Sequence, residues 1–279
     1  MIPAERHRTI ISLLSAHEVI SINDLADRLQ VSHMTIRRDI AKLEELEKVT
    51  SVSGGVQLTQ MLDSEPSHDV KSVLNSNEKS VIGYIASQLI PKKSTIYLDA
   101  GTTTLEIAHH IAQRDDLLVI TNDFVITAYL SRHGKCELYH TGGRVDKANQ
   151  SSIGGKVAEF LSSMNIDIAF ISTSSWNLKG ISTPSEPKVV VKKAIATAAQ
   201  RNILVSDSSK YGRVATFHAI GIKCFDTIVT DTDFPIHVQS EIEEKGIKVL
   251  TAHLNEPLPV LDNEVTIPKS LSIVTQNKP

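Results

Sequence analysis

The hydrophobic pattern of the first 58 residues predicts three closely spaced helices followed by a β-hairpin. Apolar residues recur at helical spacing in three stretches, which are residues 5–17, 21–30 and 32–48. Ser21 and Ser32 open the second and third stretches and can cap a helix by accepting a backbone hydrogen bond. Alternating apolar and polar residues at 49–52 and 56–58 then flank the Gly54-Gly55 pair, which is typical of a hairpin.

From residue 78 to residue 252, short apolar runs alternate with amphipathic stretches. We expect the runs to be strands; they are residues 94–98, 117–120, 136–140, 167–172, 203–205, 227–229 and 247–250. We expect the amphipathic stretches to be helices; they are residues 105–112, 125–131, 157–164, 189–199 and 238–245. This alternation is typical of an α/β domain, in which a mostly parallel sheet carries helices on both faces.

Two further segments lack a sustained period. The polar residues between the hairpin and the α/β region predict an interdomain linker, and the proline-containing carboxy-terminal end predicts an extended or disordered tail. The organisation that we expect is a winged helix-turn-helix domain at 1–58, a linker at 59–77, an α/β domain at 78–252 and a tail at 253–279.

Composition narrows the class of protein. The 279 residues include 29 Lys and Arg against 32 Asp and Glu, for a net charge of -3, which excludes a protein that holds an acidic polymer by bulk positive charge. Two cysteines are too few for a disulfide framework and have no zinc-ligand spacing. We therefore expect a cytoplasmic protein with no metal site. Neither a long apolar run nor a signal-peptide pattern is present, so we also expect no membrane contact.

A short helix, a tight connection and a longer helix that begins with polar and basic residues can place the longer helix in a DNA major groove. Ser32, His33 and Thr35 lie on its first turn, where base edges are reached. Arg37 and Arg38 can bind phosphates or a guanine edge. These residues therefore predict a recognition helix.

Charge is the argument against DNA binding. The first 58 residues carry seven basic and eight acidic side chains, so binding would depend on where the charges lie. Glu44, Glu45 and Glu47 would have to point away from the duplex. The helix order alone leaves a winged-helix protein-interaction module as the alternative.

The first of the predicted α/β strands ends in the sequence LDAGTTT, at residues 98–104. Ligands of open α/β sheets bind beyond the carboxyl ends of the strands. Gly101 allows a tight turn, and the helix start with the hydroxyls of Thr102, Thr103 and Thr104 can surround a phosphate. No P-loop lysine is present, which argues against a nucleoside triphosphate. The alternative is an ordinary turn capped by threonine.

Three more predicted strand ends carry polar motifs, which are Thr121-Asn122-Asp123, Thr141-Gly142-Gly143-Arg144 and Ser206-Asp207-Ser208-Ser209-Lys210. Asn122 can donate to and accept from a sugar hydroxyl, and Lys210 can neutralise an anion. Read singly, Asp123 could be only a helix cap, the glycine pair only a turn, and the basic residues only surface charges.

The segment SINDLADRLQVSHMTIRRDIAKLEEL, followed by a glycine pair, resembles the DNA-binding domain of the DeoR family of bacterial transcriptional regulators. The family helix typically reads V-S-x-x-T-I-R-R-D-L, so the resemblance implies that Ser32, Thr35, Arg37 and Arg38 belong to the operator-contacting helix. The family usually has a basic residue and a histidine just before the glycine pair. Ser51 and Ser53 replace them here, so we expect the wing to hold phosphate more weakly.

The α/β region resembles the sensor domain of the same family, which is similar in fold to ribose-5-phosphate isomerase. The motifs DAGTTT, TN, GG, DIAF and DSSK occur in the family order. The resemblance implies a phosphorylated sugar or sugar derivative as effector, and no cofactor. The residues that it implies around this effector are Asp99, Gly101, Thr102, Thr103, Thr104, Thr121, Asn122, Gly142, Gly143 and Lys210. It leaves open whether Glu186 or Lys188 contacts the sugar.

Likeness to an isomerase raises the alternative of an enzyme, which would need a general base and a second acid group. Asp167 falls where the isomerase has an acid-rich loop, but Ile168, Ala169 and Phe170 follow it, so we interpret Asp167 as structural. The histidines 109, 110 and 140 show neither triad nor metal spacing, and Trp176 is expected to pack or to act as a lid.

The function that we expect is therefore regulatory and not catalytic. The predicted protein is a repressor of a carbohydrate-utilisation operon. It would bind double-stranded operator DNA as a dimer or tetramer, because one small recognition helix buries too little surface to select an operator alone.

Overall fold

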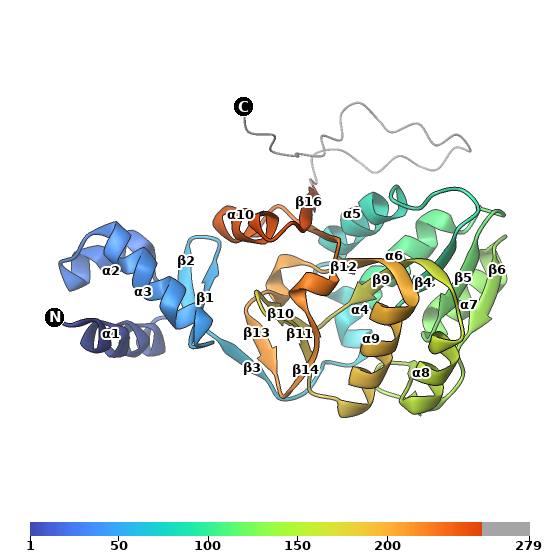
Figure 1. Cartoon of the computed structure of the whole chain (residues 1–279), viewed down its shortest axis with the longest axis horizontal. Coiled ribbons are helices and arrows are strands. Elements are labelled where there is room, and N and C mark those ends of the chain that lie inside the picture. Colours follow the sequence, from blue (N-terminus) through green and yellow to red (C-terminus); the bar gives the residue numbers. More distant parts are fainter. Residues whose placement is uncertain (253–279) are drawn as a thin grey trace.

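The computed structural model describes residues 1–252, so the predicted tail lies outside the described residues. The chain forms two lobes (Figure 1). The amino-terminal lobe contains α1 (Pro3–Ala16), α2 (Ile22–Leu29), α3 (His33–Glu45), β1 (Val49–Val52) and β2 (Gly55–Leu58). These are the three helices and the hairpin that the hydrophobic pattern predicts, with ends that differ by at most three residues.

Serine caps fix the starts of α2 and α3. Ser21 Oγ accepts a hydrogen bond from the amide of Asp24 at 3.0 Å, and Ser32 Oγ accepts one from the amide of Thr35 at 3.2 Å. Each cap satisfies an amide that the helix itself cannot. Gln30, with φ of 51°, ends α2 in a left-handed conformation and turns the chain towards α3.

Asp39 joins two helices of this lobe. Its side chain is buried and accepts hydrogen bonds from Arg6 Nε at 2.6 Å and from Arg6 Nη2 at 3.0 Å. His7 Nε2 lies 3.0 Å from the same carboxylate. Because Arg6 and His7 belong to α1 and Asp39 to α3, the aspartate that follows the two arginines holds the helices together.

The carboxy-terminal lobe is built on a seven-stranded sheet in which every neighbouring pair is parallel. The strands, in spatial order, are β16 (Lys248–Ala252), β15 (Thr227–Asp231), β12 (Ala199–Val205), β9 (Ile166–Ser172), β4 (Thr95–Leu98), β5 (Leu118–Thr121) and β6 (Glu137–His140). Each corresponds to one of the seven predicted runs. The strand order reverses between β4 and β9, since the chain proceeds from β4 towards one edge and from β9 towards the other.

Helices cover both faces of this sheet, which confirms the predicted fold class (Figure 1). On one face lie α5 (Ser76–Ser87), α6 (Thr102–Ile111) and α7 (Phe124–His133), and on the other lie α8 (Gly155–Ser162), α9 (Glu186–Ala198) and α10 (Ile236–Glu244). Neighbouring residues of one strand belong to opposite cores: Ile96 packs under the first set of helices and Tyr97 under the second. The pattern did not predict α5.

Short strands that the sequence did not predict extend the second face. They are the three-stranded antiparallel sheet β10 (Ser175–Asn177), β11 (Gly180–Thr183) and β14 (Phe217–Gly221), and the hairpin β7 (Arg144–Asp146) with β8 (Ser151–Ile153). Trp176 on β10 is fully buried, and its ring lies 4.9 Å from Tyr211 and 5.3 Å from Phe234 between centroids. Trp176 is therefore a packing residue.

The segment between the two predicted domains has regular structure. Residues 59–77 contain β3 (Gln60–Leu62), α4 (His68–Val73) and the first residues of α5. β3 pairs in parallel with β13 (Arg213–Ala215) of the carboxy-terminal lobe. Strand pairing thus attaches the connection between the lobes to the α/β lobe.

Gly180 of β11 and its cross-strand partner Gly221 of β14 offer a matched test of how these two strands pack. Gly180 has φ of +137°, and a Cβ there would lie 2.0 Å from the carbonyl oxygen of Ile220, whereas a Cβ on Gly221 would meet nothing closer than 3.8 Å. We expect Gly180→Ala to lower the free energy of unfolding by about 2 to 3 kcal/mol, because both the φ and the clash are unfavourable. Gly221→Ala should change it by less than about 0.5 kcal/mol. Urea unfolding checks both, and equal losses would contradict the assignment.

Candidate functional site

A pocket opens at the carboxyl edge of the seven-stranded sheet. Asp99 follows β4 and Thr173 follows β9, and both residues line it. These are the strands between which the strand order reverses, and ligands of α/β proteins bind in such a crevice. We call this cavity the sheet-edge pocket.

Six of the ten predicted effector residues line the sheet-edge pocket, namely Asp99, Gly101, Thr102, Thr103, Asn122 and Lys210. The first-turn amides of α6, which starts at Thr102, have no acceptor within the helix. They point out of the positive end of the helix dipole, which favours an oxyanion. The start of α6 can therefore bind a phosphate group.

The structure places the other four predicted residues outside the pocket lining. Thr104 is fully buried, and its hydroxyl donates to the carbonyl oxygens of Asp99 at 2.6 Å and Gly101 at 2.7 Å. The Thr121 hydroxyl accepts a hydrogen bond from the backbone amide two residues further on. Gly142 and Gly143 adopt φ of +63° and +111° in the turn after β6. All four hold the turns and caps around the site.

Asn122 lines the pocket, but protein groups already occupy its amide. Its Oδ1 accepts from the Tyr97 hydroxyl at 2.8 Å and from the Ala100 amide at 3.0 Å, and its Nδ2 donates to the Ser152 carbonyl at 2.8 Å. The side chain thus fixes the turn that leads into α6. Asn122 therefore has less hydrogen-bonding capacity left for a sugar hydroxyl than the sequence suggested.

Asp123 shares this structural role. It caps α7 by accepting from the amides of Val125 at 2.7 Å and Ile126 at 2.9 Å, and it also accepts from the Gly101 amide at 3.1 Å. Burial raises the pKa of Asp123 to about 6, although these hydrogen bonds oppose the shift. The reading of Asp123 as a helix cap agrees with these contacts.

A buried ion pair joins three elements at the centre of the pocket. Asp99 is 2% exposed and pairs with Lys192 of α9, and it accepts a hydrogen bond from the Ser172 amide at 3.0 Å. Lys192 Nζ also donates to the Ser172 carbonyl at 2.6 Å. β4, β9 and α9 meet at this cluster, so Asp99 positions the site.

Lysines dominate the charge of the sheet-edge pocket. Five lysines line it, which are Lys71, Lys79, Lys188, Lys192 and Lys210, together with three carboxylates, Glu65, Asp99 and Asp207. With histidine neutral, the lining carries a formal charge of +2. Burial lowers the pKa of Lys210, whose Nζ lies 3.7 Å from the nearest oxygen of Asp207. An incoming dianion would neutralise this lining.

Two buried polar atoms of the lining have no partner among residues 1–252. They are His68 Nε2 and Ser151 Oγ, on side chains that are 5% and 0% exposed. Burial lowers the pKa of His68, so its neutral ring can donate or accept a hydrogen bond. Buried polar atoms are nearly always satisfied, and these two therefore point to a hydrogen-bonding ligand or water.

The sequence reasoning missed part of this lining. Glu65, His68 and Lys71 belong to the segment interpreted as a linker, and Lys188 and Lys192 belong to α9. His68 and Lys71 on α4, and Lys188 and Lys192 on α9, have helical spacing, because residues three or four apart lie on one side of a helix. Glu65 precedes α4 and has no such signal. Lys188 approaches Glu65 to 2.7 Å, whereas Glu186 is exposed and lies outside the lining.

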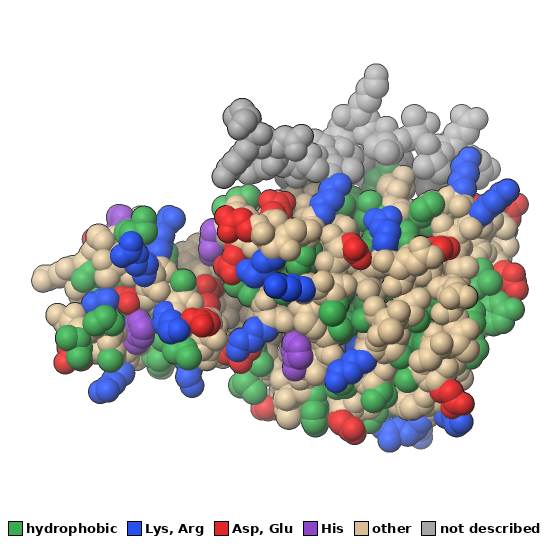
Figure 2. Space-filling view, viewed as in Figure 1, with side chains coloured by type: hydrophobic (Ala, Val, Ile, Leu, Met, Phe, Trp, Pro, Cys, Tyr) green, Lys and Arg blue, Asp and Glu red, His purple; other side chains and the backbone are tan. Residues whose placement is uncertain are grey.

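The second candidate site is the exposed start of α3. His33, Arg37 and Arg38 are exposed there, and Thr35 is half-buried beside its cap, Ser32. Met34, which the sequence reasoning passed over, is 60% exposed on the same turn and can contact a thymine methyl group. Figure 2 shows basic, acidic and apolar side chains interspersed over the visible face of this lobe. Positive charge therefore does not cover that face, and DNA binding would depend on individual basic residues such as those at the start of α3.

Of the three glutamates near the end of α3, Glu44 and Glu47 have partners that lie away from the start of the helix. Glu44 accepts from the Ser51 amide of the wing at 2.7 Å. Glu47 accepts from Asn177 Nδ2 at 3.1 Å and pairs with Lys179 at 3.1 Å, both in the α/β lobe. The acidic residues near the end of α3 therefore serve the wing and the contact between lobes.

The residues considered for catalysis lie elsewhere. Asp167 accepts a hydrogen bond from the Thr95 amide at 2.8 Å, at the opposite end of the strands from the sheet-edge pocket. The histidines 109, 110 and 140 are absent from the pocket lining. Within the described residues, no three His, Cys, Asp or Glu side chains gather to hold a metal ion, and no helix is long and apolar enough to cross a membrane.

Comparison with known proteins decides the family. Residues 6–61 match the DeoR-like helix-turn-helix domain, and residues 74–232 match the DeoR C-terminal sensor domain. The chain belongs to the DeoR family. In this DeoR-family protein the amino-terminal lobe is a helix-turn-helix domain and the α/β lobe is a sensor domain.

Relatives of this DeoR-family chain are regulators. It is 58% identical to an HTH-type transcriptional regulator of Haemophilus influenzae over 89% of this chain and 97% of the relative. It is 32% identical to the HTH-type transcriptional repressor GlcR of Bacillus subtilis, over 92% of this chain and 99% of GlcR. The protein is thus a transcriptional regulator and not an enzyme.

Ribose 5-phosphate isomerase A of Methanocaldococcus jannaschii is among the solved structures that resemble the DeoR-family chain. The two are 16% identical, with a TM-score of 0.36, over 49% of this chain and 55% of the isomerase. A likeness at this level carries no argument about activity.

Glu65 should make the free energy of unfolding of this DeoR-family protein depend on pH in the acidic range. Burial would raise its pKa, but Lys188 and Lys71 outweigh burial and lower the pKa to about 2 from 4.5. As the pH falls, Glu65 is therefore protonated in the unfolded chain before it is protonated in the folded protein. The stabilisation is present above about pH 4.5 and is lost as the pH falls towards 2. The shift corresponds to an upper limit of about 3 kcal/mol.

We therefore expect the stability difference between the native protein and Glu65→Gln to be largest near pH 7 and to shrink below about pH 4.5. Urea unfolding at a series of pH values measures it. Asp63→Asn, which removes an exposed carboxylate two residues away, should show no such dependence. A difference for Glu65→Gln that is constant with pH would contradict the assigned ion pairs.

Proposed function

We propose that this regulator binds operator DNA through the start of α3, and that a phosphorylated sugar or sugar derivative in the sheet-edge pocket changes that binding. The observation that carries this proposal is the short physical connection between the pocket and the wing. It runs through the loop that follows β12.

Residues of one loop contact both sites. Asp207 and Lys210 line the pocket, and Gly212, two residues further on, donates from its amide to the Trp176 carbonyl at 2.8 Å. The Gly212 carbonyl accepts from the hydroxyl of Thr50, in strand β1 of the wing, at 3.2 Å. A Cβ on Gly212 would lie 2.1 Å from the Thr50 side chain, so the lobes touch closely here. A ligand that moves Lys210 would move the support of the wing.

The chemistry of the pocket fits a phosphorylated sugar. A phosphate dianion at the start of α6 would meet free amides, and its charge would balance the +2 of the lining. The unpartnered Ser151 hydroxyl and His68 ring offer hydrogen bonds to sugar hydroxyls. No cofactor is needed for such a sensor.

Repression of a carbohydrate-utilisation operon is the regulatory output that we assign. GlcR, a relative of the same length range, is named a repressor. Effector binding can alter operator occupancy only if it favours one of two conformations, with a coupling of about 1 to 3 kcal/mol. The cytoplasmic protein would act as a dimer or tetramer on half-sites about 34 Å apart or a multiple of this.

Replacing Arg37 and Arg38 by Ala tests the DNA-binding half. The double variant should bind operator DNA at least about tenfold more weakly, and its dependence of log affinity on log salt should be shallower by about 2 if both arginines contact phosphate. Gel shifts at several salt concentrations measure both effects. The control is Arg132→Ala with Arg201→Ala, which removes two exposed arginines of the α/β lobe. Native retention by the first variant would refute the assignment of α3.

Lys210→Ala tests the sensing half. A thermal-shift screen of pentose and hexose phosphates should find a compound that raises the midpoint of unfolding, because it binds only the native state. Lys210→Ala should weaken that compound's binding about tenfold or more and leave operator affinity unchanged. Lys156→Ala, on the exposed surface of α8, is the control. An unaltered effector response in Lys210→Ala would place the effector elsewhere.

A further inference from the structure

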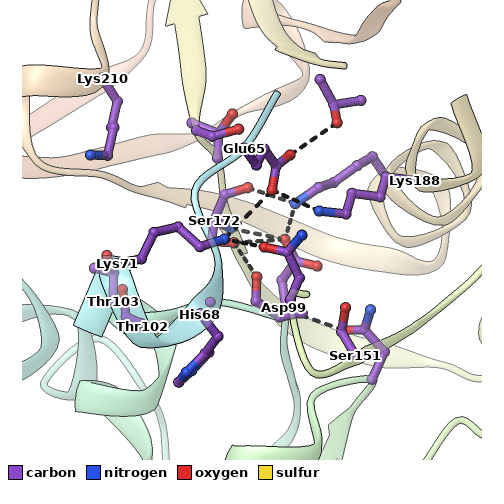
Figure 3. Close-up of a pocket in the computed structure, with 18 of the residues that line it drawn as sticks. Glu65, His68, Lys71, Asp99, Thr102, Thr103, Ser151, Ser172, Lys188 and Lys210 are labelled. Carbon is purple, nitrogen blue, oxygen red and sulfur yellow. Dashed lines mark hydrogen bonds and ion pairs between the residues drawn. The ribbon is translucent and has the colours of Figure 1, made fainter. Parts of the chain in front are cut away.

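One carboxylate in the sheet-edge pocket comes from the segment that connects the two lobes. Glu65 lies between β3 and α4, and its side chain is only 10% exposed. It accepts hydrogen bonds from Lys188 Nζ at 2.7 Å and from the Thr183 hydroxyl at 3.2 Å, and Lys71 Nζ lies 3.5 Å away. Figure 3 shows Lys71 and Lys188 approaching Glu65 from opposite sides.

The three donors around Glu65 form a site for an oxyanion in their own right. Two ammonium groups and one hydroxyl converge on a single carboxylate, which is the donor set that binds carboxylates and phosphates from solution. We call Lys71, Thr183 and Lys188 the lysine subsite. Thr102 and Thr103, at the start of α6, line the same pocket, and Figure 3 shows them on the Lys71 side of it, away from Glu65 and Lys188.

We propose that the lysine subsite is a second anion-binding subsite of the sheet-edge pocket, filled by Glu65 in the unliganded protein, and that an oxyanion of the ligand displaces Glu65 from it. This inference rests on the proposed function and specifies how the pocket is regulated. A carboxylate held by ion pairs is exchangeable for another anion without leaving the lysines unpaired. Loss of Glu65 alone would leave Lys71 without a carboxylate partner and Lys188 with only Asp146, whose nearest oxygen is 3.6 Å from its Nζ.

Displacement of Glu65 would act on the DNA-binding domain through the chain itself. Two residues separate Glu65 from the end of β3, and one residue, Thr59, separates β3 from the wing strand β2. β3 in turn pairs with β13, which follows the loop of Lys210 and Gly212. The Glu65 segment and this loop therefore run side by side from the pocket to the wing, and the ligand would release one while it holds the other.

Titration calorimetry with inorganic phosphate, in the absence of DNA, tests the subsite on the full chain. We expect Glu65→Gln to bind phosphate about tenfold more tightly than the native protein, because the neutral amide competes poorly for two ammonium groups. Asp63→Asn, which removes a neighbouring exposed carboxylate, should bind like the native protein. Adding Thr183→Val to Glu65→Gln removes one donor without changing the charge. The double variant should bind phosphate at least about threefold more weakly than Glu65→Gln.

Equal or weaker phosphate binding by Glu65→Gln would overturn the proposal, as would an absence of binding in both proteins or a gain that Thr183→Val leaves intact. These measurements need no operator. Failure of the subsite is thus distinct from failure of DNA binding, which gel shifts report separately.

Hydrogen exchange of the native protein provides a second test that needs no variant. Saturating phosphate should speed exchange of the backbone amides of residues 60–67, because that segment loses its anchor, and should slow exchange at the start of α6. Slower exchange at residues 60–67 would show that Glu65 stays and that the segment closes over the anion, and it would overturn displacement.

Discussion

Compensation of buried positive charge is the constraint on which the rest of the molecule depends. Five lysines surround one pocket, and each contacts a carboxylate, a carbonyl or a hydroxyl of the protein. Buried ammonium groups without such partners would destabilise the fold. The partners come from the turn after β4, from the loop after β12 and from the segment that leads to the wing. Charge balance at one point thus ties the sheet to the connection with the DNA-binding domain.

The hydrophobic pattern predicted the helices of the first lobe, which bury one regular face, and the seven strands of the large sheet, which are short apolar runs buried on both faces. Ser21 and Ser32 mark two helix starts because a hydroxyl cap has a local signature. The short strands β10, β11 and β14 escaped prediction, since their sequences, SWN, GIST and FHAIG, form neither a continuous apolar run nor a regular alternation. α5 escaped because most of its surface is buried, which erases the alternation of apolar and polar positions.

The candidate site was predictable where a residue follows a strand, as Asp99, Gly101 and Lys210 do. It was not predictable where the chemistry depends on a long-range contact. Thr104 and Asn122 have the side chains of ligand-binding residues, yet intramolecular hydrogen bonds already use them. Conversely, Glu65 and Lys71 look like ordinary polar linker residues until the fold brings them to Lys188. A side chain's chemistry is visible in the sequence, but its partners are set by tertiary structure.

The segment between the two family matches has a consequence for how such regulators diverge. Glu65, His68 and Lys71 fall after residue 61 and before residue 74, so part of the pocket belongs to neither matched domain. A chimera that exchanged the helix-turn-helix domain together with the connecting residues would therefore also change the lining of the sheet-edge pocket. Under the proposed function, ligand preference can therefore change through substitutions in about a dozen connecting residues, while both matched domains stay as they are.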